Sequence, residues 1–310
     1  MSAVSSYSSN SPVIFFGYWS GALPEVTELH FRSFIHYHPH STYDLWLDQD
    51  TQSSLHPNMH WLENHPQIKI RHFSLQELID QYITPKQALN HTEKPWHEWI
   101  RKQHKRKIFR WINLQSWMHP AIGVTYKHSS PFFKGFLQNL AYRGDLARCL
   151  LPLHEYQHPS LYVDLDICFL SNLLDLCQDQ GFAYRWEEFS FANSAVLYTP
   201  NKKAAQAIVD QGNAIETFIP WHLFTDANCQ RLNIHIYPTN LFDPGWDRNS
   251  MLRNDVGLFF KKTAQSTAIV DELFIKGYRV NHWHNNWKTI PEVDSPYQQL
   301  LRQLKPAPHL

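Results

Sequence analysis

The pattern of hydrophobic and polar residues along the chain predicts strands that alternate with helices. Residues 13–19 form a nearly continuous apolar run, typical of a buried strand, and residues 24–36 place apolar side chains at near-helical spacing. A second strand-like segment follows at residues 43–48. Together these three segments predict a β-α-β unit with two parallel strands, and therefore an α/β fold.

The next segments continue the alternation. Residues 68–73 are strand-like, and residues 74–82 have the pattern of a helix. Ser74 stands at the N-cap position of that helix with Glu77 three residues later, as in a capping box. The second half of residues 132–151 predicts a further helix, and no internal repeat is visible.

Two aspartates interrupt the next apolar run. Residues 161–170 are apolar except for Asp164 and Asp166, which are two positions apart. In a strand such side chains point to the same side, so both carboxylates are expected beyond the carboxyl end of the strand, where open α/β sheets bind ligands. Two adjacent anions need a cation, and Mg²⁺ or Mn²⁺ carrying phosphate oxygens would supply it. The alternative is a pair of solvent-facing carboxylates with no ligand.

The helix that precedes these aspartates carries a second charged pair. Asp145 and Arg148 are three residues apart and lie on neighbouring positions of one helical face. They form either an ordinary ion pair of the helix or part of a site that holds a polar ligand.

Composition narrows the class of protein. The 310 residues are 43% hydrophobic and 15% aromatic, with 28 Lys and Arg against 28 Asp and Glu, so a packed core is feasible and the whole chain does not attract nucleic acid. The four cysteines form no CxxC pair, and no leader or membrane span is visible, so we expect reduced thiols in a protein of the cytosolic type. The sequence contains no Walker loop, GxGxxG, GxSxG or HExxH motif, which argues against the commonest hydrolase and dehydrogenase families.

Charge is distributed unevenly along the chain. Residues 99–144 contain nine Lys or Arg and no Asp or Glu, most densely at residues 101–111. This segment is either a solvated helix face or a contact with phosphate, an anionic membrane or an acidic acceptor.

The order of these motifs resembles a known family. The chain is similar to glycosyltransferases of the GT-A fold that carry a DXD motif, in particular the bacterial group related to clostridial glucosylating toxins and α-1,4-galactosyltransferases. The similar segments are residues 15–24 (the family's WxGxxP), 43–48 (its second strand), 144–148 (SDxxR), 162–166 (YxDxD), 191–198 (an Asn-bearing strand) and 281–287 (HxWxxxW). The chain departs from the pattern at Gly144, which replaces a Ser, at residues 158–160, which replace Gly-Gly, and in the last motif, where the His is shifted by one residue.

The resemblance implies roles for nine residues. It assigns catalytic roles to Asp164, Asp166, Arg148 and Asn193, binding of the nucleotide sugar to Trp19, Asp145, Arg148, Asp164 and Trp287, and metal binding to Asp166 with His282 or His284. Within this scheme Trp19 stacks on the base, and either histidine can complete the metal shell. Glu187, Glu188 and Asp226 are further candidates for contact with the acceptor.

The resemblance also implies an activity and a domain plan. We expect a Mn²⁺- or Mg²⁺-dependent transfer of a hexose from a nucleotide-diphosphate sugar, with UDP as the expected nucleotide, to a glycan, lipid or protein, with retention of configuration. The plan is a disordered tail at residues 1–12, a GT-A domain at residues 13–290 with a mixed sheet flanked by helices and a basic helical insertion at about 85–130, and a tail at residues 291–310. Bacterial polysaccharide biosynthesis in the cytoplasm fits this activity; a peripheral contact at the inner membrane face and secretion as an effector stay open.

Two rival functions remain at this point. An inactive module of the same fold would use the basic region to dock on an anionic partner or membrane. A metal-dependent phosphoesterase would use Asp164 and Asp166 and would not need Trp19.

Overall fold

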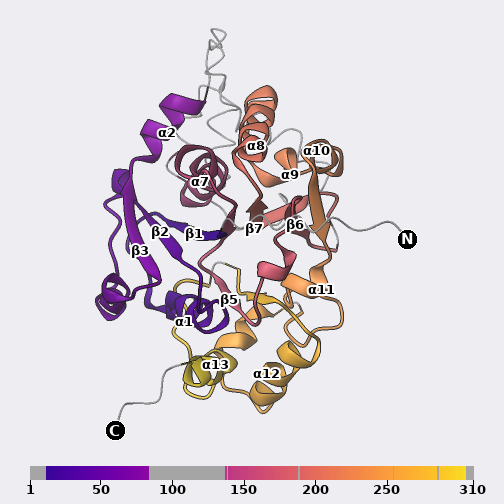
Figure 1. Cartoon of the computed structure of the whole chain (residues 1–310). Helices are drawn as coiled ribbons and strands as arrows, with labels where there is room; N and C mark the ends of the chain where they lie inside the picture. The colour runs from indigo at the N-terminus through magenta and orange to yellow at the C-terminus, as the bar shows by residue number, and fades with distance from the viewer. Residues whose placement is uncertain are drawn as a thin grey trace, which may run out of the picture.

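The computed structural model has three layers, with helices on both faces of a central sheet (Figure 1). It describes residues 12–83, 137, 139–187, 189–253, 255–284 and 286–304. In Figure 1 helices α2, α7 and α8 lie above the sheet and α1, α12 and α13 lie below it. The predicted α/β class with a mixed sheet flanked by helices is confirmed.

The strands form one large and one small sheet. The strands are β1 (Ile14–Trp19), β2 (Tyr43–Asp48), β3 (Ile68–Phe73), β4 (Ser160–Val163), β5 (Ile167–Phe169), β6 (Gly181–Arg185), β7 (Ala192–Thr199), β8 (Ile234–Tyr237) and β9 (Val280–His282). The large sheet has the order β3-β2-β1-β4-β7-β6-β8, in which only β7 runs antiparallel to its neighbours. The small sheet pairs β5 with β9.

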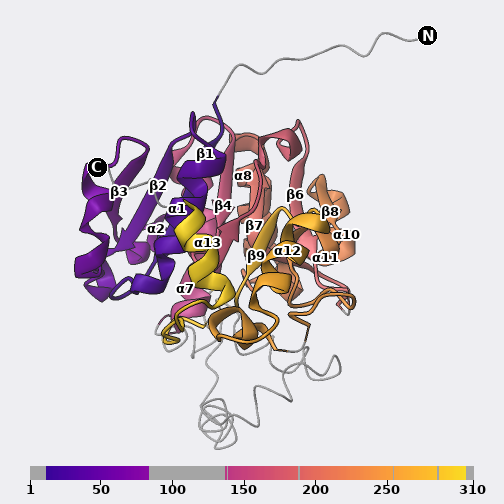
Figure 2. The same cartoon turned by 90° about the horizontal axis from the view of Figure 1, so that it is seen from below.

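The helices cover both faces of the large sheet (Figure 2). The α-helices are α1 (Glu28–Tyr37), α2 (Leu75–Tyr82), α7 (Leu140–Glu155), α8 (Lys202–Ile215), α9 (Pro220–Leu223), α10 (Asp226–Arg231), α11 (Thr239–Phe242), α12 (Ser266–Ile275) and α13 (Pro296–Leu304). Short 3₁₀ helices are η1 (Glu25–Thr27), η2 (Gln49–Thr51), η3 (Pro57–Asn64), η5 (Leu174–Leu176) and η6 (Val256–Phe260). None of the helices in the described ranges combines the length and hydrophobicity that a bilayer-spanning helix requires.

Alternation along the strands divides the core between the two faces. Phe15 on β1 packs in the cluster on the α1 side, whereas its neighbour Phe16 packs in the cluster on the α7 side. The predicted β-α-β unit is confirmed, since β1 and β2 are parallel and α1 connects them. The predicted cap is also present, because Ser74 Oγ accepts a hydrogen bond from the Glu77 amide at 3.2 Å.

The apolar run with the two aspartates is divided between two strands, of which the second is not expected from the sequence. β4 ends at Val163, the segment 164–166 forms a turn, and β5 begins a second sheet at Ile167. Two buried, charged side chains are compatible with a turn at the strand end but not with a continuous buried strand. The aspartates therefore lie just beyond the carboxyl end of β4.

Helix α1 holds β5 on the edge that β9 leaves free. The carbonyl of Ile167 lies 2.7 Å from His30 Nδ1, and the Phe169 amide donates to Ser33 Oγ at 2.9 Å. The Leu173 amide, just after β5, donates to His38 Nε2 at 3.0 Å. Side chains of one helix thus replace a missing strand partner and fix the segment that follows Asp166.

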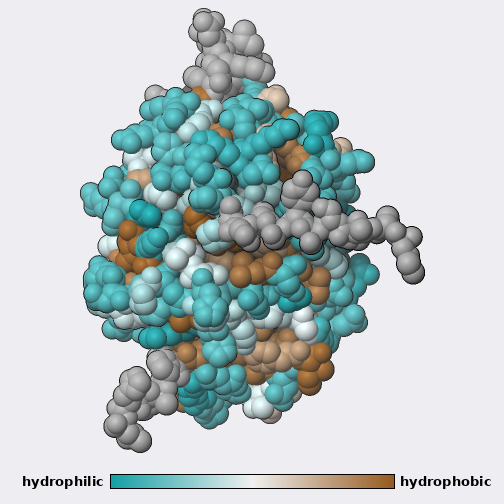
Figure 3. Space-filling model, viewed as in Figure 1, coloured by the Kyte–Doolittle hydropathy of each residue, from teal (hydrophilic) through white to brown (hydrophobic). Residues whose placement is uncertain are grey.

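The chain's last described helix belongs to the folded core. Within residues 291–310, which we expect to be a tail, α13 buries Tyr297, Leu300 and Leu301 in a cluster with α12. The surface around α12 also shows hydrophobic residues in an otherwise mainly hydrophilic view (Figure 3), and its Ile275 is 84% exposed.

Two expected features of the chain lie outside the described residues. The first is the expected tail at residues 1–12, of which only residue 12 is described. The second is the basic insertion, which includes residues 101–111.

Candidate active site

One cleft contains all nine residues to which the family resemblance gives a role. Its volume is about 900 Å³, and it opens where β1, β4 and β6 end and β7 begins. The nine are Trp19, Asp145, Arg148, Asp164, Asp166, Asn193, His282, His284 and Trp287. Residues up to 268 positions apart in the sequence therefore share one site.

The two aspartates and one histidine form a cluster that can hold a cation. One ligand atom from each of Asp164, Asp166 and His282 lies within 4.8 Å of the others, and His282 Nε2 is 3.2 Å from Asp166 Oδ1. The small sheet explains this arrangement, because Ile167 is opposite His282 in the β5–β9 register and the Trp283 amide donates to the Asp166 carbonyl at 2.9 Å. Two carboxylate oxygens with one imidazole suit Mn²⁺ or a similar first-row ion.

The electrostatic state of His282 supports a cation at this place. Burial disfavours the charged imidazolium, but Asp166 and Asp243 outweigh burial and raise the pKa of His282 to about 10. Its second nitrogen, Nδ1, lies 2.8 Å from the hydroxyl of Tyr184. The carboxylates around His282 thus stabilise positive charge at the end of β9.

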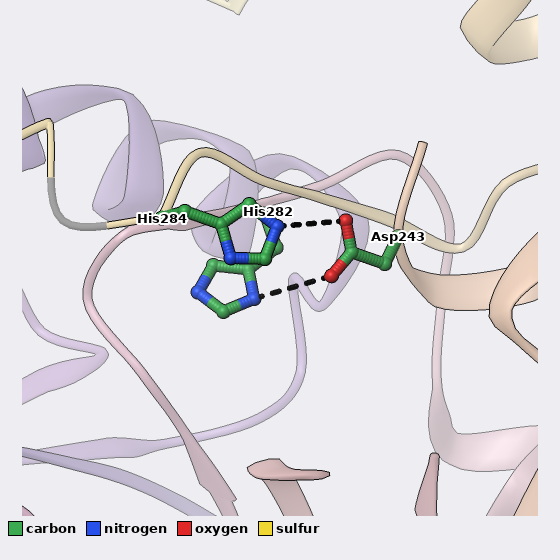
Figure 4. Close-up of side chains that lie close together, drawn as sticks. All are labelled: Asp243, His282 and His284. Atoms are coloured by element: carbon green, nitrogen blue, oxygen red, sulfur yellow. Dashed lines mark hydrogen bonds and ion pairs between the residues drawn. The ribbon is translucent and has the colours of Figure 1, made fainter. Parts of the chain in front are cut away.

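Asp243 faces both His282 and His284, whose rings lie close together on one side of it (Figure 4). Its Oδ1 is 2.9 Å from His284 Nε2, its Oδ2 is 3.6 Å from His282 Nδ1, and it is fully buried. Burial alone would raise the pKa of Asp243, but the two histidines hold it well below its usual range. His284 adopts a left-handed backbone with φ of 49°, a conformation that is costly for a residue other than glycine and that recurs at functional sites.

This arrangement distinguishes the two histidines. His282 Nε2 faces Asp166, whereas His284 uses its Nε2 for Asp243. His282 therefore belongs to both candidate clusters, with Asp164 and Asp166 and with Asp243 and His284, whereas His284 belongs only to the cluster with Asp243. The sequence alone does not tell which of these two histidines binds metal. It also gives no sign of Asp243, because nothing near position 243 resembles a motif.

Arg148 is the buried cation beside the aspartates. Its guanidinium is 3.2 Å from Asp164 Oδ1 and 3.4 Å from Asp145 Oδ1, and it donates to Ser194 Oγ at 2.9 Å. Burial raises the pKa of Asp145 to about 7 although Arg148 opposes the shift. The pKa of Asp164 is also raised, first by burial and then, against the opposing Arg148, by Asp166. This part of the cleft therefore concentrates carboxylates that require positive partners.

An aromatic pair lies at the β1 side of the cleft. The rings of Trp19 and Trp287 are 4.6 Å apart between centroids and 70° from parallel, which is an edge-to-face contact. Trp19 ends β1 and Trp287 follows β9, so the pair joins the two distant motifs of the sequence. Lys288, next to Trp287, also lines the cleft and adds an exposed cation that sequence reasoning did not identify.

Asn193 is engaged in the site's framework. Its Nδ2 donates to the Tyr184 hydroxyl at 2.9 Å, and its Oδ1 accepts from the Ala195 amide at 2.9 Å. Because Tyr184 contacts His282, Asn193 is linked to the aspartate cluster through one hydroxyl.

Two of the suggested acidic contacts for the acceptor lie outside the cleft lining. Glu187 is exposed and pairs with Arg248 at 2.9 Å, Asp226 pairs with Arg185, and neither lines the cleft. The third, Glu188, lies outside the described residues. Aromatic and apolar side chains line this part of the cleft instead: Trp186, Phe189, Phe191, Pro220 and Trp221.

Comparisons with known proteins give distant structural similarities only. No family model and no curated protein matches the chain. Among solved structures, the WbbM bifunctional glycosyltransferase is similar over 96% of this chain and 52% of its own, with 9% identity and a TM-score of 0.45. The apo glycosyltransferase GlyE of Streptococcus pneumoniae TIGR4 is similar over 94% of this chain and 60% of its own, with 12% identity and a TM-score of 0.45. The galactosyltransferase LgtC is similar over 96% of this chain and 97% of its own, with 11% identity and a TM-score of 0.39.

These similarities do not assign a family. The chain spans about half the length of WbbM, and its identity to each of the three proteins is 12% or less. The function is therefore inferred from the cleft itself.

Proposed function

We propose that the chain is a metal-dependent glycosyltransferase of the GT-A type that transfers a hexose from a UDP-sugar to an acceptor hydroxyl. The observation that carries the proposal is the convergence of a cation-binding triad, a buried arginine and an aromatic pair in one cleft. These groups match the three parts of a nucleotide-diphosphate sugar: the diphosphate, the sugar and ribose hydroxyls, and the base.

Asp164, Asp166 and His282 would hold the cation. Their oxygen and nitrogen atoms lie close enough to share one ion, and the carboxylate of Asp166 beside His282 would stabilise its charge. Bound Mn²⁺ would neutralise charge that develops on the leaving diphosphate.

Other side chains would bind the donor. Arg148 and Lys288 place positive charge on the cleft wall, where they can stabilise phosphate oxygens. Asp145 and Asp164 can accept hydrogen bonds from sugar or ribose hydroxyls. Trp19, with Trp287 against it, offers an aromatic surface for the base.

We propose retention, which the family resemblance implies, without a glycosyl-enzyme. Asp164 accepts a hydrogen bond from Tyr162 and pairs with Arg148, and Asp166 is paired with His282, so neither is free to attack the sugar. In the proposed step the bond from C1 to the diphosphate oxygen breaks, and a bond from C1 to the acceptor oxygen forms on the same face. The acceptor's proton passes to the leaving phosphate oxygen.

A donor screen tests this proposal. The wild-type protein is incubated with UDP- and GDP-sugars and Mn²⁺, and nucleotide release is measured. We expect release from at least one UDP-sugar, and a decrease of about 1000-fold in Asp166→Ala, because the ion's charge stabilisation of several kcal/mol is lost. Asp226→Ala is the control, since Asp226 lies outside the cleft.

Other outcomes would contradict the proposal. Binding of a nucleotide sugar without release would indicate an inactive binding module, and release of phosphate from simple esters would indicate a phosphoesterase. Full activity of Asp166→Ala after metal chelation would exclude the proposed mechanism.

A further inference from the structure

Three side chains form a layered stack that ends at the cleft. The guanidinium of Arg253 lies 5.7 Å from the ring centroid of Trp246. Trp246 in turn stacks on Trp186 at 4.9 Å, with the two rings only 17° from parallel. Trp186 lines the cleft, whereas Trp246 does not. One face of the Trp186 indole is therefore covered by Trp246, while the side chain of Trp186 still lines the cleft.

Further contacts fix the orientation of Trp186. Its indole Nε1 donates a hydrogen bond to Asp243 Oδ2 at 2.7 Å. Phe189 approaches it at 5.6 Å with an angle of 61°. Since stacking, a hydrogen bond and an aromatic edge all restrain the ring, Trp186 is a rigid flat surface that needs little reordering when a ligand binds.

This surface is on the side of the aspartates opposite to Trp19. Trp19 ends β1, Asp164 follows β4 and Trp186 follows β6, and β4 lies between β1 and β6 in the sheet. Asp243 also connects Trp186 to the histidines, because one of its oxygens accepts from Trp186 and the other contacts His284. The cleft thus has two separate aromatic surfaces with the cation site between them.

We infer that Trp186 is the stacking platform for a pyranose ring of the acceptor. This inference rests on the proposed function, in which the nucleotide base uses the Trp19 side. The axial C–H groups on one face of a pyranose carry partial positive charge, and the face of an indole is negative, so the two attract when they stack. Phe189, Phe191 and Trp221 extend the apolar wall around the platform.

A flat surface of this kind suits a sugar ring better than an alkyl chain. A rigid indole at the cleft wall matches one planar ring face, and its position next to the cation site would bring a hydroxyl of the same ring to the donor's C1. The acceptor is therefore a glycan or glycoside whose terminal pyranose presents an apolar face. A lipid tail at this place is an outcome that the experiment below can detect.

Saturation-transfer NMR tests the inference, because it detects weak binding and shows which ligand protons contact the protein. The probes are methyl β-D-glucopyranoside, methyl β-D-galactopyranoside and octyl β-D-glucopyranoside, each with UDP and Mn²⁺. In the wild-type protein we expect the strongest signals from axial ring protons on one face of the sugar. In Trp186→Ala these signals should fall by about threefold to tenfold, the factor typical of one aromatic contact.

Matched variants separate stacking from general damage. Trp186→Phe keeps an aromatic face and should retain part of the ring signal. Trp61→Phe is the control, because Trp61 packs under Arg32 and does not line the cleft. Signals from UDP should persist in Trp186→Ala, since the base is expected on the other aromatic surface.

Several results would overturn the inference. These are the absence of pyranoside signals in the wild-type protein, equal pyranoside signals in wild type and Trp186→Ala, or stronger saturation of the octyl chain than of the sugar ring. If UDP fails to bind the wild-type protein, the proposed function fails, whereas pyranoside signals that depend on Trp186 would still support a sugar platform.

Discussion

The two edges of strand β5 carry buried histidines in opposite states of charge. On the α1 edge, burial lowers the pKa of both His30 and His38 to about 4. On the β9 edge, His282 is also buried, yet its pKa is raised to about 10. The difference lies in the partners: a carbonyl and a hydroxyl contact His30, whereas carboxylates face His282.

This difference in charge indicates that the β9 edge of the strand favours a positively charged group. Burial alone makes a histidine neutral, as on the α1 edge, where the imidazoles serve as hydrogen-bonding groups that hold β5. Positive charge at His282 depends on Asp166 and Asp243, and Asp166 would stabilise a cation bound at Asp164, Asp166 and His282 in the same way. The α1 edge is thus structural and the β9 edge is the candidate site.

The largest expected effect comes from removing the fixed cation beside the candidate site. Arg148→Ala leaves Asp164 and Asp145, both largely shielded from solvent, without their partner, so we expect a loss of about 3–5 kcal/mol in the free energy of unfolding. Urea denaturation measures this loss. Arg279→Ala, which removes a more exposed pair with Asp175, should cost less than about 1 kcal/mol. Similar losses for both variants would contradict the account of a charged site.

The next effect concerns pH and the α1 edge. The folded-state pKa of His30 and His38, about 4, is below the ordinary histidine value of about 6.5, so the unfolded chain binds more protons between these values. The stability that these neutral histidines contribute is present above pH 6.5 and is lost as the pH falls toward 4. The loss is up to about 3 kcal/mol for each histidine.

Denaturation at several pH values measures this dependence. His30→Gln stays neutral at every pH, so its stability should fall less steeply with acidification than that of the wild-type protein, whatever its stability at neutral pH. His60→Gln, at an exposed position, is the control. An unchanged slope in His30→Gln would show that the α1 edge is not held by a neutral histidine.

The smallest expected effect separates the two histidines of the β9 edge. His284→Asn removes a side chain that contacts Asp243 rather than Asp166, so Mn²⁺ affinity should decrease by about tenfold, as for groups that orient a ligand. His282→Asn should abolish measurable binding. Metal titration checks both variants, and the reverse order of effects would assign the ligand role to His284.

The sequence predicts the strands and helices of the fold, and the residues that form the site, better than it predicts the contacts between those residues. Strand β1, helix α1 and the Ser74 cap follow from local patterns, which short-range interactions determine. The gathering of Trp19, Asp166 and His282 agrees with the order of motifs. The two-strand division at 164–166 was not predicted, because its cause is the pairing of β5 with β9, more than a hundred residues away.

The same reason explains the residues that the sequence did not identify. Asp243 and Trp186 lie outside any recognisable motif, and their roles arise only when β6, α11 and β9 come together. The segment 186–189 attracted attention for its glutamates, but the side chains in the cleft are Trp186 and Phe189. The polarity of the residues in this segment therefore did not predict which of them line the cleft.

The most direct measurement for the central claim is a calorimetric titration of metal-free protein with Mn²⁺. If Asp164, Asp166 and His282 hold a cation, the wild-type protein binds one Mn²⁺ per chain with a saturable curve, and Asp166→Ala shows no saturable binding. Asp226→Ala should behave as the wild type. Identical titration curves for wild type and Asp166→Ala would contradict a cation site at Asp164, Asp166 and His282.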